Sequence, residues 1–293
     1  GFRNEISPRQ ALIRMREFSQ AEVEVFYLDG DDFPVPESHA DLSLLRNTGE
    51  LQKVKVSEAF KSGIIGNRVM AYFLNKTYDI LLKLGFKQDR IRAREHDPGE
   101  RAHYSSETWD FEYLMDGDWI EIVGVSDRGT YDLGRHQQFS GENFQIDGKT
   151  PKVIEPSYGV DRILLTVMDS SYYKRDNGYK VLRLDPHIAP VHLAVFPLQK
   201  KDDLDRIARG LFDRIRSVDP FVFYDDGGNI GRRYARQDEI GTPYCVTIDY
   251  QSKEDGTVTI RERDSTSQVR ISMDELIERA KYFPDSFTEL FKH

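Results

Sequence analysis

Apolar and polar residues near the start of the chain alternate with the two-residue period of a β-strand. The alternation places two sets of side chains on opposite faces: Phe18, Gln20, Glu22, Glu24 and Phe26 on one, and Ser19, Ala21, Val23 and Val25 on the other. A shorter β-prone run precedes it across the Ser7-Pro8 turn, so the two runs predict an antiparallel hairpin. We expect the small and β-branched face to join the core and the opposite face to line a cleft.

Three later stretches predict the elements that follow. Residues 58–84 carry apolar side chains at helical spacing and end at Gly85, which predicts one amphipathic helix. Residues 119–124 read as a buried strand that contains one acidic residue, Glu121. Residues 153–165 predict a strand, a tight turn and then a helix, with glycine allowing close backbone approach at the junction.

From residue 189 onward, predicted strands alternate with predicted helices. The strands are expected at 191–198, 221–224, 244–249 and 258–263, and the helices at 202–217, between the turn at 225–229 and Gly241, and after Ser272, which forms a capping box with Glu275. This order predicts a small α/β domain with a mixed sheet. We place the domain boundary after residue 187.

Composition indicates a globular protein without a membrane span. The 293 residues are 39% hydrophobic and 31% charged, and no apolar run reaches the length that spans a bilayer. The single cysteine, Cys245, excludes an internal disulfide and a Cys-based zinc cluster, and it fits a reducing cytoplasm. The net charge of −9 argues against indiscriminate nucleic-acid binding, although basic patches at 87–94 and 232–236 remain candidates for RNA contact.

The charged side chains of the hairpin suit a bound polyanion that also presents amine groups. Arginine matches phosphate oxygens, and a carboxylate accepts hydrogen bonds from an amine. The alternative is a solvated hairpin with surface salt bridges, which the charge pattern by itself favours. Glu121 has a similar alternative: either it faces a cation or a metal, or it forms a strand-end salt bridge with Arg128.

Particular motifs resemble those of a known family. Phe2-Arg3-Asn4-Glu5 followed by Arg14-x-Arg16-Glu17-Phe18 closely resembles motif 2 of class II aminoacyl-tRNA synthetases, and the continuation at 19–22 resembles the glycyl-tRNA synthetases. Residues 153–165 are similar to motif 3, residues 119–124 to the central strand between the motifs, residues 91–112 to an insertion near the acceptor end of tRNA, and residues 230–236 to the anticodon-binding domain. The resemblance is to the archaeal and eukaryotic type of glycyl-tRNA synthetase, from motif 2 to the C-terminus.

The resemblance implies an α+β fold in two domains. Residues 1–187 would form a class II catalytic domain, with an antiparallel sheet, helices and an insertion at about 53–117. Residues 188–293 would form a small α/β anticodon-binding domain with a mixed sheet. Motif 1, which supplies much of the dimer interface in this family, is absent, so we interpret the chain as part of something longer whose activity alone is left open.

The implied function is that of a glycine–tRNA ligase, which uses ATP and Mg²⁺ to activate glycine and then transfers it to the 3′ end of tRNA(Gly). Arg3 and Arg162 would be catalytic. The implied ATP-binding residues are Arg3, Asn4, Glu5, Arg14, Met15, Phe18, Glu121, Ile122 and Arg162; the glycine-binding residues are Glu22, Glu155 and Ser157; Glu121 would hold Mg²⁺; and Arg232, Arg233 and Arg236 would contact tRNA. The full-length protein would be a cytoplasmic homodimer.

Two other functions are compatible with the same motifs. The first is a non-catalytic nucleic-acid-binding subunit that inherited the synthetase fold, as the accessory subunit of mitochondrial DNA polymerase has. Loss of the nucleotide-binding arginines would favour this alternative. Here Arg3, Glu5, Glu121 and Arg162 are all present, so we rank it lower. A synthetase-like ligase that acts on another small acceptor would use the same adenylation site.

Overall fold

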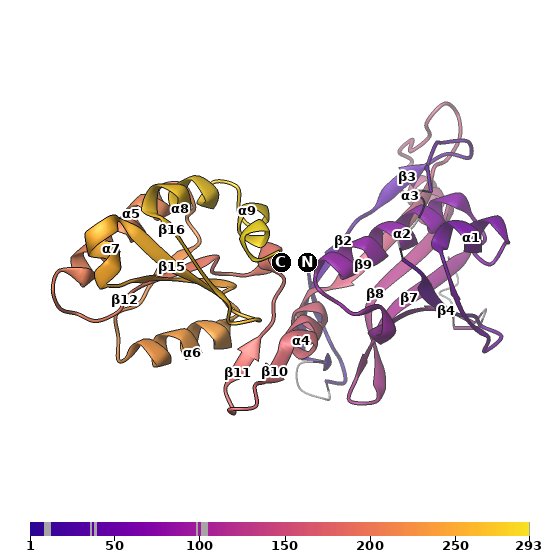
Figure 1. Ribbon diagram of the computed structural model, residues 1–293. Helices are drawn as coiled ribbons and strands as arrows, with labels where there is room; N and C mark the ends of the chain where they lie inside the picture. Colours follow the sequence, from indigo (N-terminus) through magenta and orange to yellow (C-terminus); the bar gives the residue numbers. More distant parts are fainter. Residues whose placement is uncertain (9–12, 36, 38–39, 98, 101–104, 293) are drawn as a thin grey trace. The chain divides into compact units, whose positions relative to one another are not determined.

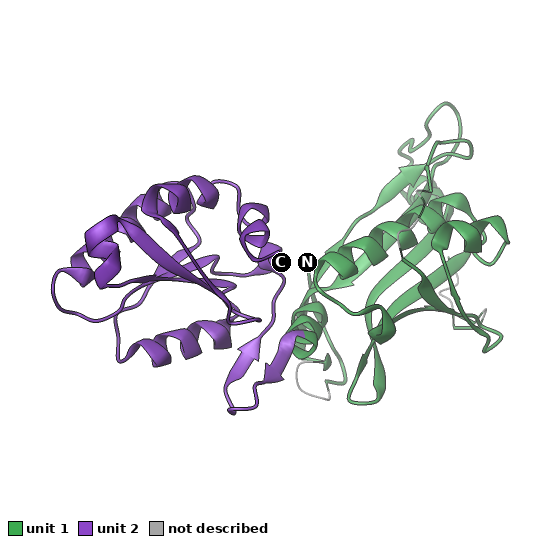
Figure 2. Ribbon diagram, viewed as in Figure 1, with its two compact units in different colours: residues 1–170 green, residues 171–293 purple. Residues whose placement is uncertain are grey.

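The computed structural model describes the whole chain except residues 9–12, 36, 38–39, 98, 101–104 and 293. The chain forms two compact units, Gly1–Ser170 and Ser171–His293 (Figure 2). Each unit is described on its own below.

A large, mainly antiparallel sheet forms the frame of the first unit (Figure 1). Its strands are β1 (Phe2–Asn4), β2 (Glu17–Glu22), β3 (Val25–Tyr27), β4 (Leu42–Leu45), β5 (Leu51–Val54), β6 (Ile91–Glu95), β7 (Glu107–Met115), β8 (Asp118–Gly129) and β9 (Lys152–Gly159). Their order is β1-β2-β9-β8-β7-β6-β4-β5, with β3 also paired to β9. β1 pairs with β2 in antiparallel fashion, with Arg3 opposite Phe18, which confirms the predicted hairpin.

The helices of the first unit are α1 (Val56–Lys61), α2 (Arg68–Lys83), η2 (Gln88–Arg90), α3 (Tyr131–Ser140) and α4 (Val160–Ser171). The prediction of one helix over 58–84 is wrong, because the chain breaks between α1 and α2. Gly63 has a φ of +75°, and Asn67 begins α2 by accepting a hydrogen bond from the Met70 backbone N–H. The predicted strand, turn and helix over 153–165 are confirmed as β9 and α4.

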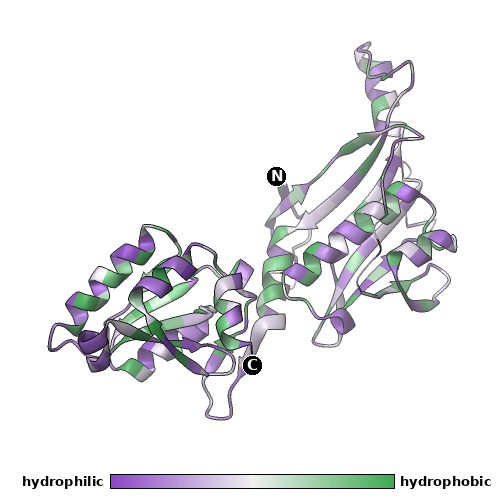
Figure 3. Ribbon diagram, turned by 45° about the horizontal axis from the view of Figure 1, so that its top comes forward, coloured by the Kyte–Doolittle hydropathy of each residue, from purple (hydrophilic) through white to green (hydrophobic). Residues whose placement is uncertain are grey.

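The core of the first unit lies where α2 packs on β8 and β9. Leu74, Tyr78 and Leu81 of α2 and Trp109 and Phe111 of β7 are buried. Purple and green bands along the helices in Figure 3 show the polar and apolar faces that this packing requires.

The predicted core face of the second hairpin strand is buried only at its far end. Tyr27 is buried and its ring packs 6.0 Å from that of Phe33, which in turn contacts α2 through Tyr72. Ala21 and Val23 are exposed, so the prediction is wrong at these two positions. The alternation itself continues unbroken, since β2 and β3 pair with β9 in the same register.

The second unit contains a mixed five-stranded sheet in its described residues, as predicted, with the order β13-β12-β14-β15-β16. β12, β13 and β14 are parallel, and β15 and β16 continue antiparallel. The elements are β10 (Tyr172–Lys174), β11 (Lys180–Leu182), η3 (Pro186–Ile188), β12 (Leu193–Pro197), α5 (Leu204–Arg216), β13 (Val222–Tyr224), α6 (Ile230–Ile240), β14 (Tyr244–Ile248), α7 (Tyr250–Asp255), β15 (Thr257–Glu262), β16 (Gln268–Ser272), α8 (Met273–Ala280), α9 (Asp285–Thr288) and η4 (Glu289–Phe291).

Helices cover both faces of this smaller sheet (Figure 1). Leu211 and Ile215 of α5 and Leu276 of α8 pack in one apolar cluster with the sheet, whereas Ile230 and Tyr234 of α6 pack in another. The β10–β11 hairpin belongs to this unit because α6 packs on β11. The second compact unit therefore begins before residue 187, where the sequence predicts the domain boundary. The domain boundary itself stays a prediction.

Among the described residues, none of the helices combines the length and the apolar composition that crossing a bilayer demands.

Candidate nucleotide and amino-acid site

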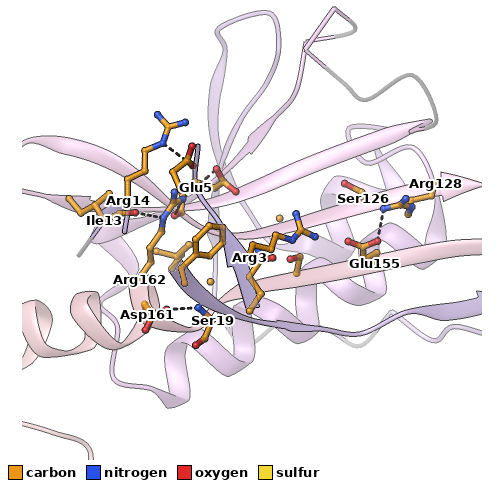
Figure 4. Close-up of a pocket in the computed structure, with 17 residues that line it drawn as sticks. Arg3, Glu5, Ile13, Arg14, Ser19, Ser126, Arg128, Glu155, Asp161 and Arg162 are labelled. Carbon is orange, nitrogen blue, oxygen red and sulfur yellow. Dashed lines mark hydrogen bonds and ion pairs between the residues drawn. The ribbon is translucent and has the colours of Figure 1, made fainter. Parts of the chain in front are cut away.

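A cavity of about 290 Å³ lies on one face of the large sheet, between the β1–β2 hairpin, β8, β9 and the start of α4 (Figure 4). It brings together residues that lie up to 159 positions apart in the sequence, from Arg3 to Arg162. The predicted site residues that line it are Arg3, Glu5, Arg14, Phe18, Glu121, Ile122, Glu155, Ser157 and Arg162.

Strand pleating explains why these side chains meet. β9 lies between β2 and β8, and pairing sets Gln20 opposite Gly159 and Ser126 opposite Glu155. Because every second residue of a strand faces the same side, Phe18, Gln20, Ser126, Glu155 and Ser157 are all directed to one face. The cleft face predicted for the hairpin is therefore confirmed at Phe18 and Gln20.

A β-bulge brings Glu121 to the same cavity as its neighbour Ile122. The register between β7 and β8 shifts so that Phe111 pairs with Val123 and Glu112 with Glu121, which leaves Ile122 as the extra residue. A bulge re-aims the side chains beside it. Two successive residues of β8 thereby line the cavity.

The junction between β9 and α4 places Arg162. A Cβ atom at Gly159 would lie 3.4 Å from the Ile122 carbonyl oxygen, which is an ordinary van der Waals contact, so the close backbone approach expected at this glycine is not required by the packing. The carboxylate of Asp161 accepts a hydrogen bond of 2.6 Å from the Ser19 backbone N–H, which ties β2 to the helix start. The junction thus fixes the side chain of Arg162 at one end of the cavity (Figure 4).

Arg162 holds the segment before β2 and the strand β8 through one backbone carbonyl group of each. Its Nε donates to the Ile13 carbonyl at 2.9 Å, and its Nη1 donates to the Glu121 carbonyl at 2.8 Å. The Glu121 carboxylate lies 3.6 Å from the same Nη1. Desolvation, and next the charge of Asp110, raises the pKa of Glu121, and Arg162 opposes this rise.

Glu5 and Arg14 lie beside Arg162 (Figure 4). Arg14 Nε is 3.1 Å from the Glu5 carboxylate, which also accepts a hydrogen bond from the Ser7 backbone N–H. The Ser7 hydrogen bond first and Arg14 second lower the pKa of Glu5. Glu5 is therefore an ionised acceptor at neutral pH, in a cavity wall that also contains the aromatic ring of Phe18.

Arg3 lies between this group and the opposite end of the cavity (Figure 4). Its Nη2 contacts the Glu22 carboxylate at 2.5 Å, and Glu22 also accepts a longer hydrogen bond, 3.4 Å, from Ser157 Oγ. Glu22 itself is not part of the described cavity wall, and neither are Asn4 and Met15, which the resemblance also implies.

The far end of the cavity contains an ion pair that the sequence prediction missed. Arg128 Nη1 donates to the Glu155 carboxylate at 2.6 Å, and Arg128 Nε donates to Asp132 at 2.5 Å. The alternative of a salt bridge between Glu121 and Arg128 is therefore wrong. Arg128 is the extra residue of a second register shift, since Asp127 pairs with Ile154 and Gly129 with Val153. Such a shift leaves little signal in a sequence.

Gln20 is a second residue with no role assigned from sequence. Its Oε1 is buried and has no hydrogen-bond partner in the described part of the protein. A buried acceptor without a donor is unfavourable, and Gln20 borders the cavity. A donor group on a bound ligand would satisfy it.

The residues present fit Mg²⁺ only together with a bound phosphate. No group of three or more histidine, cysteine or acidic side chains in the described ranges is placed to hold a metal ion. Glu121 supplies one carboxylate to the cavity. Mg²⁺ is commonly held by one or two carboxylates plus substrate phosphates, so this donor set suits a metal that arrives with a nucleotide.

The three arginines of α6 in the second unit differ in their exposure. Arg232 and Arg236 border a shallow cavity, and Arg236 Nε donates to Asp225 at 2.9 Å. Arg233 is 2% exposed, and its guanidinium donates to the backbone carbonyls of the loop before α6 and of Pro197. The tRNA contact predicted for Arg233 does not fit this burial, because the side chain is used to hold the loop.

Known proteins resemble the chain in both units. Residues 192–282 match the family described as the anticodon binding domain. The glycine–tRNA ligase of Methanothrix thermoacetophila is 37% identical, over 94% of this chain and 63% of the relative. Those of Archaeoglobus fulgidus and Methanocaldococcus jannaschii are 35% and 34% identical, over 94% and 96% of this chain and 63% and 66% of the relatives.

The chain thus spans somewhat less than two thirds of the length of these relatives. The similarity covers 94–96% of this chain. The chain is homologous to the archaeal glycine–tRNA ligases, and its residues 192–282 match the anticodon-binding domain family.

Proposed function

We propose that the protein acts as a glycine–tRNA ligase, which activates glycine with ATP and transfers it to tRNA(Gly). The observation that supports this most is the single cavity that joins Arg3 and Arg162 with Glu121, Glu155 and Ser157. Cationic groups for a triphosphate and anionic groups for an ammonium lie in one continuous site.

In the first step, a glycine carboxylate oxygen attacks the α-phosphorus of ATP, the bond to the bridging oxygen breaks, and pyrophosphate leaves. Arg3, at the middle of the cavity, would bind the α-phosphate, and Arg162 would bind the γ-phosphate end (Figure 4). Glu5 would accept from the adenine amine while Phe18 stacks on the ring. Positioning of this kind contributes about 7–11 kcal/mol to such a reaction, so no side chain need act as an acid or a base.

Glycine offers only an ammonium and a carboxylate. The ammonium would lie against Glu155 and Ser157, with the carboxylate directed toward Arg3 and the α-phosphate. Glu22 would act indirectly, since it holds Arg3 and accepts from Ser157. Every other amino acid is larger, and forcing extra atoms into a well-packed site costs about 1–3 kcal/mol.

Mg²⁺ would be held by Glu121 together with the phosphates, where it would neutralise charge on the triphosphate. Desolvation and the charge of Asp110 raise the pKa of Glu121, and a bound Mg²⁺ would favour its ionised form. Arg162 would then exchange its contact with the Glu121 carboxylate for one with phosphate.

In the second step, a ribose hydroxyl at the 3′ end of tRNA attacks the carbonyl carbon of the adenylate, and AMP leaves. The second unit would select the tRNA through its anticodon, with Arg232 and Arg236 as phosphate or base contacts. Arg233 is left out of this proposal because it is buried.

We also propose that the protein works in the cytoplasm as a homodimer. The single cysteine, Cys245, is buried, as suits a reducing compartment. Phe2, Val23 and Leu164 are exposed apolar side chains of the first unit that a partner subunit could cover.

Glycine-dependent exchange between ATP and labelled pyrophosphate tests the proposed function, with alanine and serine as controls. The proposal expects exchange with glycine and none with either control. Equal exchange with alanine would refute the assignment of the amino-acid end. Absence of exchange with any amino acid, together with retained tRNA binding, would support the non-catalytic alternative instead.

A further inference from the structure

A second cavity, of about 530 Å³, continues along the same face of the large sheet. The hairpin strand borders both cavities in turn: Phe18 and Gln20 line the first, and Glu24 and Phe26 line the second. Among the described residues, Arg128 is the one that borders both cavities. Its side chain therefore lies at the boundary between them.

Arg128 is held on two sides. Its Nη1 contacts Glu155 on β9 at 2.6 Å, and its Nε contacts Asp132 on α3 at 2.5 Å. The three side chains are between 11% and 24% exposed, so water screens the two ion pairs only partly. A guanidinium with two such anchors has little freedom to swing aside.

The two cavities differ in chemistry. The first has charged groups at both ends, whereas the second is lined largely by apolar side chains, which are Phe26, Leu133, Phe144, Ile146, Pro151 and Val153. A site of this kind favours an alkyl or aromatic group. In such a site each additional methylene group improves binding by about 10- to 200-fold.

We propose that Arg128 is a wall that closes the amino-acid end of the first cavity against the apolar second cavity, and that this wall restricts the substrate to glycine. The inference rests on the proposed function. If the wall were removed, a side chain on the substrate Cα could enter the second cavity, and the apolar lining would favour larger amino acids.

Binding of non-reactive aminoacyl-sulfamoyl adenosines to the protein, measured by calorimetry, tests the wall directly. The glycyl and leucyl analogues are compared on the unmodified protein, on Arg128→Ala and on Arg128→Ala combined with Leu133→Trp. We expect Arg128→Ala to raise the affinity for the leucyl analogue relative to the glycyl one by about tenfold or more. The added indole should fill the second cavity and reverse this gain.

The controls separate a wall from a structural support. Thermal melting establishes that each variant folds. If Arg128→Ala does not fold, Arg128→Gln, which retains one hydrogen-bonding group, replaces it in the same binding measurements. An unchanged ratio of the two affinities would overturn the proposal. An equal loss of affinity for both analogues in a folded variant would also overturn the proposal, because Arg128 would then act only as a support for Glu155.

Failure of the proposed function would give a different result. The unmodified protein would then fail to bind the glycyl analogue, or it would prefer the leucyl one. Pyrophosphate exchange with glycine and with leucine on the same variants provides a second measure of the preference between the two amino acids.

Discussion

Individual side chains in the cavity differ in how tightly they hold a proton. Hydrogen bonds and Arg14 lower the pKa of Glu5, whereas desolvation raises that of Glu121. Both are carboxylates in one cavity, so the difference comes from their surroundings rather than from residue type. Their identity could be predicted from the local motifs, but their environment could not, because Asp110, Arg162 and the Ile122 bulge are set by strand pairing.

Glu121 should control the acid limb of the exchange reaction. A raised pKa means that Glu121 gains its proton as the pH falls, at a pH above its ordinary value of 4.5. The ionised form is the one that would bind Mg²⁺, so activity should fall in that window. Glu121→Gln should lower exchange and remove this limb from the pH profile. A variant with the same acid limb as the unmodified protein would contradict the assignment.

Substitution of Glu155 should weaken the binding of glycine and leave the binding of ATP unchanged. Glu155→Gln replaces a charged acceptor by a neutral one, which costs about 1.5–3 kcal/mol for a hydrogen bond to a charged group and should raise the KM for glycine by about one to two orders of magnitude. The KM for ATP should stay unchanged. Glu24→Gln is the matched control, since Glu24 lies on the same face but borders the second cavity. A larger effect on ATP than on glycine would place Glu155 elsewhere in the mechanism.

Elements were predictable where apolar periodicity or glycine placement marks them. The junction of β9 and α4 combines both signals, and it is confirmed. The break between α1 and α2 was missed because Asn67 and Gly66 acquire their roles through Glu107, a residue about 40 positions away that accepts from both. α7 was missed because its six residues, Tyr250–Asp255, carry no apolar period.

Asp249 stabilises the second unit at the start of α7. Its carboxylate accepts from the Ser252 backbone N–H and contacts Arg270 of β16 through two nitrogens at 2.8 Å. Asp249→Ala should therefore lower the free energy of unfolding by about 0.5–2 kcal/mol for the lost cap alone. Chemical denaturation measures this.

The effect of Asp249 should depend on pH. Arg270 lowers the pKa of Asp249, so the stabilisation is present above its unfolded value and is lost as the pH falls through the lower folded value. Glu254→Ala, at an exposed position of the same helix, is the control and should change stability by less than about 0.5 kcal/mol. Equal effects of the two substitutions would show that the cap and the ion pair contribute nothing.

The whole chain joins a unit with the candidate site to a unit that matches an anticodon-binding domain. The order of these parts was predictable, because the motifs are local in sequence. The same motifs predict that the first unit activates glycine and that the second unit recognises tRNA. Removal of residues 171–293 tests this division. Exchange should survive this deletion, whereas charging of tRNA should be lost. Unchanged charging by the shortened protein would contradict the proposed role of the second unit.

The central claim is that one cavity activates glycine with ATP, with Arg3 at the phosphate where the reaction occurs. The most direct test compares glycine-dependent pyrophosphate exchange by Arg3→Ala and Arg16→Ala. Both remove an exposed arginine from the same hairpin, but only Arg3 lines the cavity in the described structure. Arg3→Ala should lower exchange by about 10²–10³-fold or more, as loss of a group that stabilises transition-state charge does, while Arg16→Ala stays near the unmodified rate. Equal rates for the two folded variants would contradict the account.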